Sequence, residues 1–271
     1  MLKDKLYEIM NNDYALPEGL NEFEAVQQVI AVLGSTDAEL RDNLGYHVLA
    51  KWLLDKKFLT NEQLEKVLEQ AISKDLLLHK IGEVDSDSVF QRTFSSLLIA
   101  LILIRDNRDP FLSEISFRNA MDRIIIYCEL EKDYRSYIEG KGWAHGPAHI
   151  SDAIDECVQS RFTGMADCES LWNSLMKLLI NAPQVFDAEE DERIATAVTT
   201  MVETGKVSIP TLCHWLGKVV LPEKKDIPSM NQRINFKHFL RSLIIRLQTK
   251  GLISREEHSL IEIERTFNTF L

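Results

Sequence analysis

Apolar residues recur at intervals of three and four along nearly the whole chain, and this spacing constrains the fold more than any other feature. The segment Leu40–Asp55 shows it clearly. Runs with the strict alternation of a half-buried strand are missing, and the apolar runs Leu97–Ile104 and Ile124–Tyr127 sit inside longer helical windows. The pattern predicts an all-α protein with roughly a dozen helices, well above the usual third of residues in helix.

The junctions between the expected helices share a pattern, in which apolar residues precede a hydroxyl or carboxyl residue that can cap the next helix. The clearest junctions are Phe58-Leu59-Thr60, Phe111-Leu112-Ser113 and Leu252-Ile253-Ser254, with capping boxes Thr60-x-x-Gln63 and Ser254-x-x-Glu257. The helices before the first and last of these are expected to end at Lys57 and Gly251. Weaker signals place further helix starts at Asp167, Ser208, Thr36-x-x-Glu39 and Asp187-x-x-Glu190.

The spacing of these junctions bears on the architecture. Helix starts at positions 60, 113, 167, 208 and 254 are separated by 53, 54, 41 and 46 residues. One two-helix unit of the HEAT or armadillo kind takes about 40–47 residues. We therefore expect one domain over residues 1–271, an α-α superhelix of stacked antiparallel helix pairs, with a longer loop near 221–230. The alternative is that an unrelated α-protein uses the same capping chemistry.

The charge balance argues against nucleic acid as a partner. Lys and Arg total 31 against 42 Asp and Glu, a formal net charge of −11. Such a chain repels a polyphosphate backbone unless a local basic patch overrides the mean, and no such patch is apparent.

The sequence also predicts no membrane association. The longest purely apolar run, Leu97–Ile104, is far shorter than the roughly 20 residues of a spanning helix, so it is expected to be a core helix. The first residues carry charges inside their apolar pattern and lack a secretion signal. Four cysteines without a regular framework are expected to be reduced. Together these features predict a cytoplasmic protein.

The stretch from Glu139 to Asp152 is the most chemically distinctive part of the chain. On an uninterrupted helix, His145, His149 and Asp152 would fall within an arc of roughly 60°, where they could bind a metal ion such as zinc. Pro147, however, favours a helix that begins at Gly146 or Pro147 and leaves His145 in the preceding loop. The alternative is that His149 is structural and bonds the backbone or an acid such as Asp152.

Several charged residues around this stretch could form a ligand groove. Asp133, Arg135, Glu139 and Lys141 could hold a ligand or form solvated ion pairs. Arg92 lies on the most apolar helix, as a snorkelling edge residue or as the buried partner of an acid such as Asp42. With Trp143 these residues make up the predicted groove, and the segment 133–152 is expected to line the main polar pocket.

The segment from Glu131 to His149, with its Lys-Gly-Trp-Ala-His core, resembles a bacterial family catalogued as domain of unknown function 2785. The stretches Asp87–Leu97 and Leu40–Tyr46 extend the resemblance over most of residues 13–200. It implies an all-helical, armadillo-like superhelix, common in Gram-positive bacteria, with no known activity or cofactor. The chain departs from the family at Gly146-Pro147, where members usually have a small or apolar residue.

Two functions are compatible with these features. The first is a non-enzymatic binding module whose concave polar groove recognises a protein segment or a small polar ligand. The second is a metal-dependent enzyme or small-molecule binder that uses the segment 133–152. No catalytic residue is identified, because phosphate loops, nucleophile elbows and C-x-x-C pairs are missing from the sequence.

The charge balance gives a direct test. At physiological salt the protein should not be retained on duplex DNA, because its excess of acidic residues offers few cations to release the counterions of the phosphates. An electrophoretic mobility assay over a range of salt concentrations measures this. Submicromolar binding that weakens as salt rises would contradict the prediction.

Overall fold

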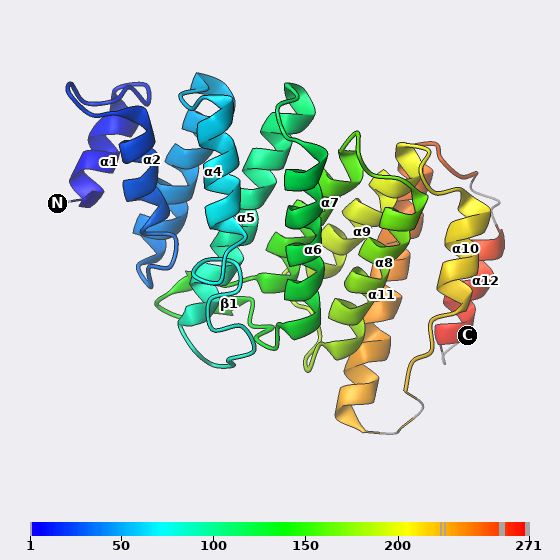
Figure 1. Ribbon diagram of the computed structural model, residues 1–271. Coiled ribbons are helices and arrows are strands. Elements are labelled where there is room, and N and C mark those ends of the chain that lie inside the picture. Colours follow the sequence, from blue (N-terminus) through cyan, green and yellow to red (C-terminus); the bar gives the residue numbers. More distant parts are fainter. Residues whose placement is uncertain (1, 223, 225, 255–257, 269–271) are drawn as a thin grey trace. The chain divides into compact units, whose positions relative to one another are not determined.

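The protein is described by a computed structural model that covers residues 2–222, 224, 226–254 and 258–268 (Figure 1). Within these residues it contains twelve α-helices, two π-helical segments (η1 and η2) and one pair of two-residue strands. The predicted all-α class is confirmed. In chain order the elements are α1 (Leu2–Asn11), α2 (Glu22–Ile30), η1 (Glu39–Tyr46), α3 (His47–Ala50), η2 (Lys51–Lys56), α4 (Asn61–Ala71), α5 (Ser88–Arg108), α6 (Glu114–Leu130), β1 (Tyr137–Ile138), β2 (Gly142–Trp143), α7 (Gly146–Gln159), α8 (Met165–Asn181), α9 (Glu190–Glu203), α10 (Ile209–Gly217), α11 (Ile227–Thr249) and α12 (His258–Phe267).

The chain divides into two compact units, Met1–Ala153 and Ile154–Leu271. Helix α7 begins in the first unit and ends in the second. Each unit has its own apolar core, because buried aliphatic and aromatic residues occur throughout both. The expectation of one domain over residues 1–271 remains a prediction.

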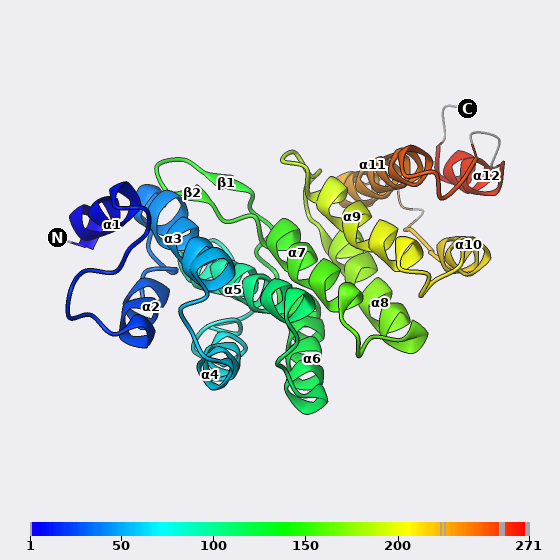
Figure 2. The ribbon, with the colours of Figure 1, turned by 90° about the horizontal axis from the view of Figure 1, so that it is seen from above.

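Helix α5 is the centre of the first unit. It is apolar on nearly all sides, and Phe90, Leu98 and Ile102 on it are fully buried. Helix α4 and η2 pack against it, and Figure 2 shows α2, α4 and α6 on one side of this unit, with α3 and α5 on the other. Among the described helices, α5 is long and apolar enough to cross a membrane, but 83% of its most apolar stretch is buried inside the protein. It is therefore the core helix that its sequence predicts.

Several predicted helix ends are confirmed. Thr60 caps α4 and forms the reciprocal box with Gln63, while Ser113 and Ser208 accept hydrogen bonds from the first turns of α6 and α10. The helix before Thr60 ends at Lys57, whose backbone is left-handed with φ of 53°. These caps satisfy N–H groups that the first helical turn leaves without an intrahelical partner.

Other helix starts differ from the prediction. Helix α8 begins at Met165 rather than after Asp167, and Asp167 instead accepts a hydrogen bond of 2.8 Å from the N–H of Gly164. Thr36 was the predicted cap, but Asp37 instead accepts a hydrogen bond of 3.2 Å from the N–H of Leu40. The capping box predicted at Asp187 is not the start of α9, because the residue before this helix is Glu189. The side chain of Glu190 accepts a hydrogen bond from the N–H of Ala188. The box at Ser254 involves Glu257, which lies outside the described residues.

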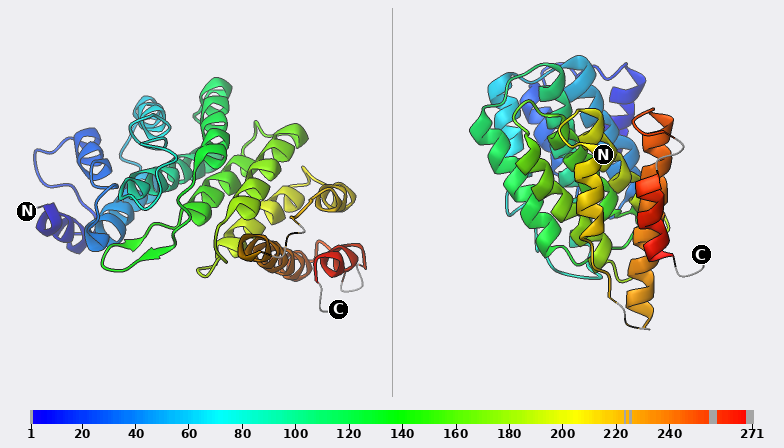
Figure 3. Two further views of the ribbon diagram at one scale, coloured as in Figure 1. Left: turned by 90° about the horizontal axis from the view of Figure 1, so that it is seen from below. Right: turned by 90° about the vertical axis from the view of Figure 1, so that its right-hand side faces the viewer.

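The second unit is built around α11, which packs against α8, α9 and α12. Figure 3 shows α12, in red, beside α11, in orange. In its core the ring of Trp172 stacks on Trp215 with centroids 5.9 Å apart. Asn235 of α11 is fully buried and receives the N–H of Phe186 at 2.8 Å, which ties the α8–α9 connection to α11. The loop predicted near 221–230 ends earlier, because Asp226 caps α11 and residues 227–230 are helical.

Candidate functional site

The segment between α6 and α7 contains a small β-hairpin that the sequence did not predict. Strands β1 and β2 are antiparallel, with Tyr137 opposite Trp143 and Ile138 opposite Gly142. Gly140 and Gly142 have left-handed backbones, with φ of 74° and 82°. A Cβ atom on Gly142 would lie 2.6 Å from the Cβ of Ala38, so this close approach to the start of η1 requires glycine.

Arg41 on η1 holds the hairpin in place. Its side chain is fully buried and donates hydrogen bonds to the carbonyls of Lys141 at 2.8 Å and Trp143 at 3.2 Å. The guanidinium lies 4.0 Å from the ring centroid of Phe90, a cation–π contact, and Nε lies 2.7 Å from Oδ1 of Asp42. Burial raises the pKa of the Asp42 carboxyl, although the charge of Arg41 opposes this shift. Asp42 therefore supplies the counter-charge of a buried guanidinium.

Arg92 is the buried partner of an acid, one of the two roles that the sequence left open. Its side chain is fully buried and forms a bidentate pair with Glu131, through Nε to Oε2 at 2.6 Å and Nη2 to Oε1 at 2.9 Å. Glu131 also accepts the N–H groups of Lys132 and Asp133, both at 2.9 Å. The acid is therefore Glu131 and not Asp42, the example that the sequence suggested, because Asp42 pairs with Arg41. Arg92 sets the path of the chain as it leaves α6.

Of the other predicted groove residues, Asp133 and Arg135 stabilise the fold, whereas Glu139 and Lys141 lie on the surface. Asp133 is buried and pairs with Arg135, which also donates to the carbonyl of Ser86 at 2.8 Å. Its hydrogen bonds to Asp133 are the main reason that the pKa of Arg135 is raised. Lys141 pairs with Asp87 at 2.7 Å on the surface, and Glu139 is exposed at the hairpin turn.

The two histidines lie next to each other where α7 begins. The helix starts at Gly146, as Pro147 predicted, and His145 precedes it with a left-handed φ of 53°. The N–H of His145 donates to the carbonyl of Arg135 at 3.1 Å. The His145 and His149 rings have centroids 5.4 Å apart, and His149 packs edge-on against Phe94 at 5.3 Å. His149 is largely buried against the core.

The structure gives no support to a metal site here. Among the residues that the structure describes, no group of three or more His, Cys, Asp or Glu side chains is arranged to hold a metal ion. His145 and His149 are neighbours, but Asp152 does not complete a set of three with them. Metal binding by these residues remains a prediction from the sequence.

The hairpin presents an aromatic surface made of Tyr137, Trp143 and His145. Tyr137 and Trp143 are 58% and 41% exposed, and their rings meet edge to face with centroids 5.0 Å apart. The His145 ring lies 5.1 Å from Trp143 on a tilted plane. The other three tryptophans, Trp52, Trp172 and Trp215, are only 1%, 3% and 6% exposed. Trp143 is thus the tryptophan that solvent and partners can reach.

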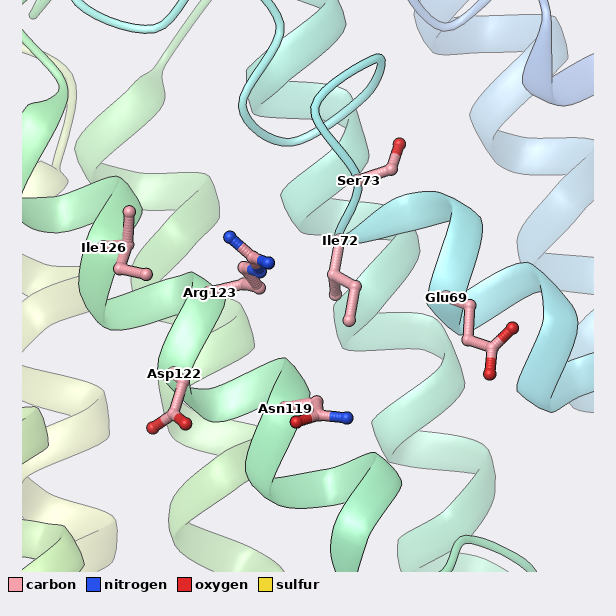
Figure 4. A pocket seen from close by; sticks show the side chains of 7 residues that line it. All are labelled: Glu69, Ile72, Ser73, Asn119, Asp122, Arg123 and Ile126. Carbon is pink, nitrogen blue, oxygen red and sulfur yellow. The ribbon is translucent and has the colours of Figure 1, made fainter.

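A separate groove of about 480 Å³ lies between α4 and α6 (Figure 4). It is lined by Glu69, Ile72, Ser73, Asn119, Asp122, Arg123 and Ile126. The sequence singled out none of these residues, because they are ordinary residues of α4, of the turn that follows it and of α6. No residue of the segment 133–152 lines this groove, so it lends no support to the expectation that this segment forms the main polar pocket.

Comparison with known proteins identifies the family. The profile of a family described as protein of unknown function (DUF2785) matches residues 77–245, more than half of the chain. The chain belongs to this family. The predicted family is confirmed, but the match begins at residue 77 and so does not include the stretch Leu40–Tyr46. The matched region contains Arg92, Glu131 and the hairpin but not Arg41. No curated protein and no solved structure matches the chain.

The role of Arg41 can be tested by replacing it with methionine. Arg41→Met removes the donors to the carbonyls of Lys141 and Trp143 and leaves Asp42 without its cation. We expect the free energy of unfolding to fall by about 3–5 kcal/mol, the usual cost of breaking a buried ion pair. Acrylamide should also quench the fluorescence of Trp143 more strongly, because the released hairpin moves away from the protein.

The matched control is Arg118→Met, which removes an exposed pair between Arg118 and Glu114 on α6. This change should alter the free energy of unfolding by no more than about 0.5 kcal/mol. Equal stability and equal quenching in the two variants, measured by urea unfolding and fluorescence, would refute the proposed role of Arg41.

Proposed function

We propose that this protein is a non-enzymatic, cytoplasmic binding module that recognises a segment of another protein through the aromatic surface of Tyr137, Trp143 and His145. The HEAT-like stacking and the bacterial origin expected from the resemblance are part of this proposal. The exposed and fixed position of Tyr137 and Trp143 is the observation that carries it.

Two properties make these rings suited to recognition. Trp and Tyr supply much contact area for few rotatable bonds, and they are enriched among the residues that dominate binding energy. Here the hairpin beneath them is already held by Arg41, through the carbonyls of Lys141 and Trp143. A partner would therefore lose little free energy in ordering this surface.

The residues around the rings resemble the rim of an interface. Lys141 pairs with Asp87, Arg135 is partly exposed and Glu139 is exposed. A polar rim around an apolar centre is the usual anatomy of a protein interface. The excess of acidic residues over the whole chain favours a protein over a nucleic acid as the partner.

Small-molecule binding or metal-dependent catalysis at this segment has less support. Asp42, Arg92 and Asp133 already engage in ion pairs with Arg41, Glu131 and Arg135. A ligand that used these groups would have to break pairs whose loss is costly in the interior.

Helical-repeat stacking is supported by the order of helices within the first unit. Successive helices α2, α4 and α6 share one side, while α3 and α5 share the other. Such pairs stack into scaffolds whose exposed loops and grooves bind partners.

Selection of peptides from a random displayed library tests the proposed function. Peptides enriched on the wild-type protein should bind Trp143→Ala and Tyr137→Ala at least about tenfold more weakly, because truncation of a central aromatic side chain commonly costs more than 1 kcal/mol. Fluorescence of Trp143 should also change on binding.

The matched control is Ile227→Ala, which truncates a side chain that is 70% exposed on α11 in the second unit. Peptide affinity for this variant should equal that of the wild type. The proposal fails if no peptide is enriched, or if the enriched peptides bind the two hairpin variants as tightly as the wild type.

A further inference from the structure

The aromatic surface of the hairpin has a geometry that suits a positively charged group. Its two exposed rings, those of Tyr137 and Trp143, face each other across the strand pair with their planes at 73° and their centroids 5.0 Å apart. Two rings that meet at nearly a right angle form a corner, and the walls of this corner are their π faces. Because the π face of an aromatic ring carries partial negative charge, such a corner attracts a cation.

The protein does not place a cation of its own in this corner. Elsewhere its arginine and lysine side chains do lie over aromatic rings, as Arg41 does over Phe90 at 4.0 Å from the ring centroid. Among the residues that the structure describes, none lies over the ring of Tyr137 or of Trp143. The cation–π contacts that these two rings can make are therefore left to a partner.

The two cations beside the hairpin have their charge balanced by acids of the fold. Lys141 in the hairpin loop donates to both carboxylate oxygens of Asp87, at 2.7 and 2.8 Å. Arg135, just before the hairpin, donates from Nε to Oδ1 of Asp133 at 2.8 Å and also from Nη2 to Oδ2. A positive group that approaches the rings therefore meets little repulsion from either cation.

Acidic groups near the rings exceed these two cations. The side chain of Asp85 is 86% exposed and lies 3.8 Å from Nε of Arg135, whose charge Asp133 already balances. Glu139 is exposed in the hairpin loop, two residues after Tyr137, and no cation in the described part of the chain pairs with it. These two carboxylates attract positive charge toward the same hairpin that presents the π faces.

We propose that the aromatic surface binds an arginine or lysine side chain within a basic segment of a partner protein. The cationic head lies in the corner between Tyr137 and Trp143, while Glu139 and Asp85 attract further basic residues of the segment. The inference rests on the proposed function and adds the chemistry of the partner to it.

Other kinds of segment match this surface less well. An acidic segment would gain an ion pair only by drawing Lys141 from Asp87 or Arg135 from Asp133. An apolar segment would bury the two rings but would also remove water from the carboxylate of Glu139 without giving it a partner, which costs free energy. A basic segment uses the rings and the excess carboxylates together.

Removal of the partner's charge tests the proposal. The probes are the peptides selected on the wild-type protein, each compared with copies in which one Arg is replaced by citrulline or one Lys by acetyl-lysine, which remove the charge. At least one such replacement should weaken binding about fivefold or more, because the cation–π contact is lost. In Trp143→Leu, which keeps apolar bulk but removes the π face, this preference for the charged peptide should shrink to about twofold or less.

A second pair of variants tests the carboxylate. Glu139→Gln should weaken binding of the charged peptides about twofold to fivefold, the usual range for an exposed ion pair. The matched control is Glu62→Gln, the same change at an exposed residue in the first turn of α4, which should leave affinity unchanged. Fluorescence anisotropy measures the affinities, and the melting temperature of each variant shows that it is folded.

The outcomes separate this inference from the function on which it rests. Peptides that need Trp143 but bind equally well after every cation has been neutralised would overturn the basic partner and leave a protein-binding surface in place. Selection of acidic peptides would do the same. If no peptide is selected, or if Trp143→Ala does not weaken binding, the proposed function and the inference both fail.

Discussion

The buried guanidinium of Arg41 connects the core of the first unit to its exposed hairpin. It stacks on Phe90 inside the protein and donates to two carbonyls of the hairpin on the other side. A buried charge is tolerated only where its donors are satisfied and a counter-charge is near, and Asp42 supplies that charge. Because removal of any one group leaves the others unsatisfied, the arrangement favours a single position for the hairpin.

The second buried arginine works on the other end of the same segment. Arg92 holds Glu131, and Glu131 in turn receives the first two backbone N–H groups beyond it. The chain then passes through Asp133 and Arg135 to the hairpin and returns through His145 in a left-handed conformation. Such a backbone persists in a residue other than glycine only where its surroundings fix it. The aromatic surface is thus exposed without being loose.

The sequence predicted those features that depend on neighbours in the chain. Helical spacing predicted the class, Thr60 and Ser113 predicted helix starts, and Pro147 predicted the start of α7. It could not identify the partner of Arg92, because Glu131 lies 39 residues away and several acids were equally available. Two-residue strands are too short to show alternation, so the hairpin was missed.

The candidate site was predicted only in part, because its contacts also join residues that lie far apart in the chain. The stretch around Trp143 stood out by its composition, but composition does not reveal burial. The sequence predicted a ligand groove that includes Asp42, Arg92 and Asp133. The structure places each of these residues in an ion pair within the protein. Arg41 was not predicted as a site residue, and its neighbour Asp42 was named instead. The hairpin residues that Arg41 contacts lie about 100 residues farther along the chain.

Hydrogen exchange at the hairpin tests most directly whether the buried arginines hold this surface rigid. The amides of Ala144 and His145 donate to the carbonyls of Ser136 and Arg135. If Arg41 and Arg92 fix the segment, these amides should exchange as slowly as those in the middle of α6, and Arg41→Met should speed their exchange at least about a hundredfold while α11 is unaffected. Exchange of the wild-type amides within seconds, as in an open loop, would contradict the account.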